Sequence, residues 1–233
     1  MTPALPVVPW SDLWAYLGRT WAQGEHLSIL GRTGRGKTTL ALELIKLRRF
    51  AMVMATKPRD ATLDKLTRPP LGFRKIEQWP PPLPAQFMPR LLVWPKYRSP
   101  ADVAGQADVM GRAIEAAFLE GGWCILADEL YYLAQDLRLR EPLRHCWQQG
   151  RALNVTLLGI SQRPSGVPLE MYSQATHLFI FRMTLQEDLK RLGEIPGSVD
   201  PVRLRRTVKQ LSGRQFLYLN TQTDVAVVSE LVL

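Results

Sequence analysis

The sequence predicts an α/β fold, with a mostly parallel central sheet flanked by helices. Continuous apolar runs of strand length alternate along the chain with segments whose apolar residues have helical spacing. Such runs are typical of strands that are buried on both faces, as they are in a parallel sheet. The predicted strands are 26–30, 50–56, 90–94, 123–127, 155–161 and 176–181.

The ends of the chain differ from this alternating pattern. Residues 1–9 are rich in proline, which predicts an arm, and a helix is predicted over 12–21. We therefore divide the chain into an N-terminal arm and helix (1–25) and a single domain (26–233). Near the C-terminus, two basic helices over 184–194 and 199–211 precede a closing β-hairpin of 215–220 and 225–232. Several prolines within 66–89 predict an irregular surface segment.

Composition limits the cellular setting and the class of partner. The 233 residues carry a formal net charge of +9, which favours an anionic partner larger than a nucleotide. No secretory signal and no apolar run long enough to cross a bilayer is recognisable, so we expect a cytoplasmic protein without stable membrane insertion. The two cysteines, Cys124 and Cys146, have neither metal-ligand spacing nor a disulfide framework.

A glycine-rich stretch between the first strand and the next helix predicts a nucleotide site. Gly31–Thr38 matches the pattern G-x-x-x-x-G-K-[ST] in its required context of strand, loop and helix. The loop's N–H groups and the helix N-terminus would hold the phosphates of ATP, Lys37 would reach the β- and γ-phosphates, and Thr38 would bind Mg²⁺. The predicted nucleotide-binding residues are Gly31, Arg32, Thr33, Gly34, Arg35, Gly36, Lys37, Thr38 and Thr39.

Polar residues at the ends of two later strands predict the catalytic half of the site. Asp128 and Glu129 directly follow the strand 123–127, and Gln162 follows 155–161. Asp128 would hold the metal opposite Thr38, and Glu129 would polarise the attacking water, which predicts hydrolysis rather than passive binding. Gln162 would sense the γ-phosphate.

One segment resembles a known superfamily closely. Gly150-Arg151 precedes an apolar strand that ends in Ser161-Gln162-Arg163-Pro164-Ser165, a pattern similar to that of the FtsK/HerA superfamily, and the resemblance covers about 26–183. It implies a RecA-like P-loop NTPase core and a ring-forming motor that moves double-stranded DNA. It also implies an arginine that reaches the neighbouring subunit's site, for which Arg151 is our first candidate and Arg144 our second.

The absence of recognisable accessory domains suggests a branch of the superfamily. The chain looks most like the genome-packaging ATPases of membrane-containing phages and related archaeal viruses. The resemblance thus implies a hexameric or pentameric ring in the host cytoplasm, which could dock at a virion vertex through portal or capsid proteins. Two other motor functions stay open, namely a conjugation or plasmid-type DNA-transfer ATPase and a filamentous-phage assembly ATPase that acts on protein. A nucleotide-gated scaffold is disfavoured by Glu129.

Contacts to DNA are expected from basic side chains that track the backbone without reading bases. The candidates are Lys57, Arg59, Arg74, Lys75, Lys96, Arg98, Arg203, Arg205 and Arg206.

A further short motif resembles a signature from an unrelated family. Leu211–Gln215 is similar to the Leu-Ser-Gly-Gly-Gln signature of ABC transporters, but it follows the Asp-Glu strand and leads into an apolar β-run. We interpret it as a turn in which Gly213 supplies unusual backbone angles.

Overall fold

The computed structural model describes residues 5–84, 87–97, 99, 101–164, 167–195 and 199–232. Within these ranges, one sheet has the strand order β3-β4-β2-β5-β6-β1-β7-β8-β9. All neighbours from β3 to β7 are parallel, and β8 and β9 are antiparallel. The strands are β1 Leu27–Leu30, β2 Ala51–Met54, β3 Arg74–Ile76, β4 Arg90–Val93, β5 Cys124–Ala127, β6 Thr156–Ser161, β7 His177–Phe181, β8 Gln215–Asn220 and β9 Ala226–Glu230.

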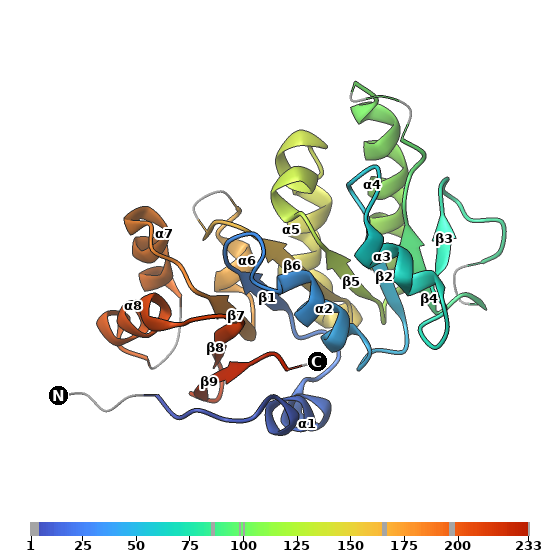
Figure 1. Cartoon of the computed structure of the whole chain (residues 1–233). Coiled ribbons are helices and arrows are strands. Elements are labelled where there is room, and N and C mark those ends of the chain that lie inside the picture. Colours follow the sequence, from blue (N-terminus) through green and yellow to red (C-terminus); the bar gives the residue numbers. More distant parts are fainter. Residues whose placement is uncertain are drawn as a thin grey trace.

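Helices cover both faces of this sheet, as Figure 1 shows. The α-helices are α1 Trp10–Thr20, α2 Lys37–Ile45, α3 Ala61–Asp64, α4 Val103–Glu120, α5 Arg140–Gln149, α6 Glu170–Ser173, α7 Gln186–Arg191 and α8 Pro201–Gln210. Short 3₁₀ segments occupy Lys65–Thr67, Gly150–Leu153 and Leu192–Glu194, and Tyr132–Asp136 forms a π-helix. The predicted α/β architecture with a C-terminal hairpin is thereby confirmed.

The continuous apolar strands fill two cores because successive side chains point to opposite faces. In β5, Cys124 and Leu126 pack in one core with α1 and α2, whereas Ile125 and Ala127 pack in the other with α4 and α5. All four residues are fully buried. Burial on both sides explains why these strands read as unbroken apolar runs.

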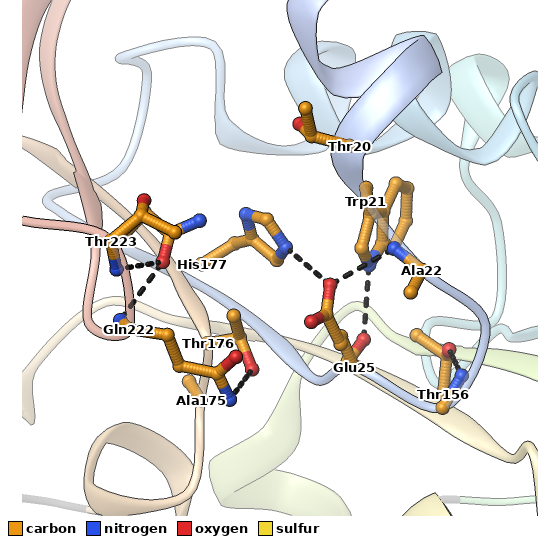
Figure 2. A network of polar contacts seen from close by, with 12 residues as sticks. Thr20, Trp21, Ala22, Glu25, Thr156, Ala175, Thr176, His177, Gln222 and Thr223 are labelled. Atoms are coloured by element: carbon orange, nitrogen blue, oxygen red, sulfur yellow. Dashed lines mark hydrogen bonds and ion pairs between the residues drawn. The ribbon is translucent and has the colours of Figure 1, made fainter. Parts of the chain in front are cut away.

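The N-terminal segment packs against the sheet. The Val8 N–H donates to the Val228 carbonyl at 2.9 Å, and the Val228 N–H donates to Pro6 at 2.8 Å, so residues 6–8 run beside β9. After α1, the Glu25 carboxylate accepts hydrogen bonds from the Ala22 N–H at 2.9 Å and from His177 Nε2 at 3.1 Å (Figure 2). Residues 6–8, before α1, and Glu25, after it, therefore both contact strands of the sheet.

Several element boundaries differ from the sequence prediction. The proline-rich segment 66–89 contains β3, a three-residue edge strand beside β4 that is too short for a recognisable alternating pattern. The first helix begins at Trp10 instead of residue 12, and the helix after β5 is a π-helix. Among the described residues, no helix combines the length and the apolar character that a membrane crossing requires.

Candidate active site

The predicted phosphate loop curls between β1 and α2. Gly34 and Gly36 have φ angles of 78° and 95°, which L side chains rarely adopt. Gly31 is required for another reason, because a Cβ there would lie 2.6 Å from the Phe181 Cβ. Lys37 is buried and its Nζ donates to the Arg32 carbonyl at 3.0 Å. The loop backbone therefore curls so that one of its carbonyls, that of Arg32, binds the Lys37 ammonium. This is the curled shape expected of a phosphate-binding loop.

Strand order brings the other predicted catalytic groups to this loop. β6 lies next to β1, and β5 lies next to β6, so the carboxyl ends of all three strands meet at one edge. Thr38 Oγ1 donates to Asp128 Oδ1 at 2.8 Å, and Thr33 Oγ1 donates to Gln162 Oε1 at 2.8 Å. The structure therefore joins the loop, the Asp-Glu pair and Gln162 into one site.

Burial sets the electrostatics of the site. Asp128 is 5% exposed, and burial raises its pKa, although the Thr38 hydrogen bond and Lys57 oppose that shift. Burial likewise lowers the pKa of Lys37, opposed by Glu129 and Asp128. Hard oxygen donors such as Thr38 Oγ1 and Asp128 suit Mg²⁺, which takes few protein ligands and completes its shell with water and phosphate oxygens.

Lys57 lies beside the two carboxylates. Its Nζ is 3.2 Å from Glu129 Oε1, 3.9 Å from Asp128 Oδ2 and 3.7 Å from Asp60 Oδ2. Burial disfavours the charged ammonium, but Asp128 and Glu129 outweigh burial and raise the pKa of Lys57. The sequence suggests Lys57 as a DNA contact. It gives no sign of the contact with Glu129, because β2 and β5 become neighbours only in the folded sheet.

Two cavities meet at these residues. A cavity of about 280 Å³ is lined by the phosphate loop, Asp128, Glu129, Gln162 and Arg214. A larger cavity of about 860 Å³ shares Lys57, Glu129 and Gln162 with it. The larger one is also bordered by three tyrosines, namely Tyr97, Tyr131 and Tyr132. The sequence predicts Arg214 only as part of the turn Leu211–Gln215, with no role in the site, and no motif marks the three tyrosines.

The two candidate arginines lie away from both cavities of their own chain. Arg151 belongs to the 3₁₀ turn that leads into β6, so it lies at the sheet edge opposite Gln162. Its carbonyl oxygen would lie 3.0 Å from a Cβ placed on Gly24. Arg144, on α5, pairs with Glu141 at 2.6 Å and donates to Gln148 at 2.8 Å. Either could act on a nucleotide only in a neighbouring subunit.

The DNA-contact candidates do not gather on one surface. Arg74 and Lys75 lie on β3 at one end of the sheet, where Lys75 contacts Glu77 and the ring of Trp94. Arg203, Arg205 and Arg206 lie on α8, which packs near β8 toward the other end of the sheet (Figure 1). Arg59 and Lys96 are exposed, and Arg98 lies outside the described residues.

Comparison with solved structures identifies the fold. The DNA-packaging ATPase B204 from Sulfolobus turreted icosahedral virus superposes with a TM-score of 0.65 at 15% identity, over 90% of this chain and 98% of that chain. The chain therefore has the fold of a P-loop NTPase. The genome-packaging NTPase B204 of Sulfolobus turreted icosahedral virus 2 in complex with AMPPCP gives 0.60 at 13%, over 91% and 100%.

A conjugation protein has the same fold. The bacterial conjugative coupling protein TrwBdeltaN70 gives a TM-score of 0.57 at 12% identity, over 98% of this chain and 93% of that chain. No protein-family model matches the sequence, and no curated protein does. The similarity to these solved structures is therefore a similarity of fold, at 12–15% sequence identity.

Proposed function

We propose that this protein is a Mg²⁺-dependent ATP hydrolase. The observation that carries the proposal is the convergence of four groups on one cavity of about 280 Å³: the phosphate loop, Asp128, Glu129 and Gln162. Two hydrogen bonds of 2.8 Å, from Thr38 to Asp128 and from Thr33 to Gln162, connect the loop to strands β5 and β6. Phosphate binding alone would not require a second, adjacent carboxylate at the end of β5.

Each residue has a defined role in this proposal. The loop N–H groups and Lys37 bind the phosphates. Thr38 and Asp128 would hold Mg²⁺, whose charge would offset the negative charge of the phosphate oxygens. Glu129 accepts a hydrogen bond from the attacking water and orients it in line with the γ-phosphate. Gln162, whose Oε1 accepts from Thr33, donates from Nε2 toward the γ-phosphate.

We further propose that hydrolysis drives movement along double-stranded DNA in a ring of identical subunits. Two observations support this step: the formal net charge of +9 and the shared fold with proteins described as DNA-packaging and conjugative coupling proteins. Packaging of a viral genome into a procapsid is our preferred role, with a hexamer or pentamer in the host cytoplasm docked on a portal or vertex protein. Conjugative DNA transfer is the second candidate, because TrwB has the same fold.

Steady-state ATP hydrolysis, with and without double-stranded DNA at two salt concentrations, tests the proposal. We expect DNA to stimulate hydrolysis and added salt to reduce the stimulation, because backbone contacts release counterions. Glu129→Gln is the matched control and should retain ATP binding while losing turnover. A rate of ATP hydrolysis that DNA does not change at either salt concentration would reject the DNA-motor assignment. Wild-type turnover in Glu129→Gln would reject the proposed role of Glu129.

A further inference from the structure

The C-terminal hairpin returns the chain to the phosphate loop. β7 lies next to β1, and β8 lies next to β7 but runs antiparallel to it. Phe181, at the end of β7, is paired with Phe216 near the start of β8. The turn that precedes β8 therefore lies at the same sheet edge as the phosphate loop, on the side of β1 away from β5.

Hydrogen bonds fix this turn against the loop. Arg35, within the phosphate loop, donates from Nη1 to the Gly213 carbonyl at 3.2 Å. The Gln215 side-chain oxygen accepts from the Ser212 N–H at 3.1 Å and from its hydroxyl at 3.2 Å. Gly213 has a φ of 50°, in the left-handed region that glycine adopts at low cost. The backbone on both sides of Arg214 is thus held in place.

Arg214 lines the cavity that contains the phosphate loop. The other cations of that cavity are already engaged, since Lys37 donates to the Arg32 carbonyl and Lys57 pairs with Glu129. In the part of the chain that the structure describes, no carboxylate forms an ion pair with Arg214. A planar guanidinium with five donors is the side chain best suited to phosphate oxygens.

We propose that Arg214 binds the phosphates of the nucleotide in its own subunit, from the side opposite Glu129. This inference rests on the proposed nucleotide site. Asp128 and Glu129, at the end of β5, define the side of the site where the γ-phosphate reacts, whereas Arg214 directly precedes β8, which lies beyond β7 on the other side of β1. Arg214 therefore contacts a phosphate nearer the nucleoside, and its ligand is a nucleoside di- or triphosphate.

Equilibrium binding of Mg·ADP and of a non-hydrolysable Mg·ATP analogue, measured by calorimetry without DNA, tests this contact. Arg214→Ala should weaken both nucleotides about tenfold or more, as expected for a charge-assisted hydrogen bond. Arg214→Lys should recover part of the affinity, and Arg214→Glu should bind more weakly than Arg214→Ala. Arg112→Ala is the control, because Arg112 is an arginine on α4 that pairs with Asp108 and does not line the cavity.

The outcomes separate this contact from a structural role and from the proposed function. Affinities of Arg214→Ala within twofold of wild type for both nucleotides would overturn the inference and leave the ATPase proposal intact. A loss confined to the ATP analogue would also overturn it, because it would place the side chain at the γ-phosphate. If Arg214→Lys binds as weakly as Arg214→Ala and both unfold at lower temperature without nucleotide, the role is structural. Wild-type protein that binds neither nucleotide would reject the proposed function itself.

Discussion

The ammonium of Lys57 lies 3.2 Å from Glu129 Oε1, the carboxylate oxygen that we assign to water activation. The same ammonium is 3.9 Å from Asp128 Oδ2, a group proposed to hold Mg²⁺. Lys57 thus supplies positive charge to two carboxylates that would otherwise repel each other. Binding of Mg²⁺ would supply this charge instead and leave Glu129 available for water.

Lys57→Ala should therefore make the stability of the folded protein depend more strongly on bound Mg·ADP. Without ligand, we expect a loss of about 1 kcal/mol in the free energy of unfolding, a modest value because half of the lysine side chain is exposed to solvent. Mg·ADP should remove most of this difference. Urea unfolding with and without Mg·ADP measures both values.

Lys65→Ala is the control for Lys57→Ala, since Lys65 is an exposed lysine that does not line either cavity. It should leave both stabilities within about 0.5 kcal/mol of wild type. If Lys57→Ala lowers the free energy of unfolding by the same amount with and without Mg·ADP, Mg²⁺ does not replace the positive charge of Lys57 at the two carboxylates.

Thr38 provides a test of the metal site. Thr38→Ala removes the hydroxyl that donates to Asp128 at 2.8 Å, and we expect at least about a tenfold fall in kcat together with a higher Mg²⁺ requirement. Thr38→Ser retains the hydroxyl and should stay close to wild type. A Mg²⁺ titration of ATP hydrolysis compares the three proteins; identical titration curves for Thr38→Ala and wild type would remove Thr38 from the metal shell.

Arg151 can be tested by mixing subunits. Arg151 lies at the sheet edge away from Gln162, so an effect on catalysis must cross a subunit boundary. Subunits with Arg151→Ala and subunits with Glu129→Gln are each expected to be inactive, and a mixture should recover hydrolysis because some sites receive both groups. The same test applies to Arg144. Co-assembled mixtures that stay inactive for both arginines would contradict a shared site.

A buried histidine predicts how stability depends on pH. His26 is 3% exposed, and its Nδ1 accepts from the Leu157 N–H at 3.1 Å. Burial, assisted by nearby Arg151, lowers the pKa of His26 to about 4. Because the unfolded chain binds this proton near pH 6.5, stability should fall as pH decreases from about 6.5 to about 4, by on the order of 2–3 kcal/mol.

Burial also lowers the pKa of His177, against the effect of Glu25, so His177 adds a loss in the same direction. The contribution of His26 is isolated by His26→Asn, whose side-chain oxygen can accept from the Leu157 N–H and does not titrate. Urea unfolding at several pH values should give a smaller slope for His26→Asn than for wild type. Parallel pH profiles would show that His26 does not titrate in this range.

The sequence predicted the strands that are buried on both faces, because an uninterrupted apolar run of strand length is typical of a parallel strand covered by helices on both sides. It did not predict β3, whose Arg74 and Lys75 are exposed on an edge strand of three residues. The π-helical geometry of Tyr132–Asp136, which follows β5, has no recognisable local pattern either. Such details depend on contacts between elements rather than on local pattern.

The residues of the candidate site likewise fall into two groups, those that the sequence predicts and those that it does not. Gly31–Thr38, Asp128, Glu129 and Gln162 were assigned from local motifs, and the structure brings them together. Lys57 and Arg214 lie at the site because β2 pairs with β5 and β8 pairs with β7. The sequence alone does not reveal these pairings. Spatial adjacency therefore adds the residues that motifs leave out.

We propose that ATP hydrolysis moves this protein along double-stranded DNA. Displacement of a labelled third strand from a triplex on linear duplex DNA tests it most directly. We expect ATP-dependent displacement by wild type, no displacement with a non-hydrolysable analogue, and no displacement by Glu129→Gln. Active ATP hydrolysis by wild type with no displacement, even when DNA length and protein concentration are raised, would contradict the claim.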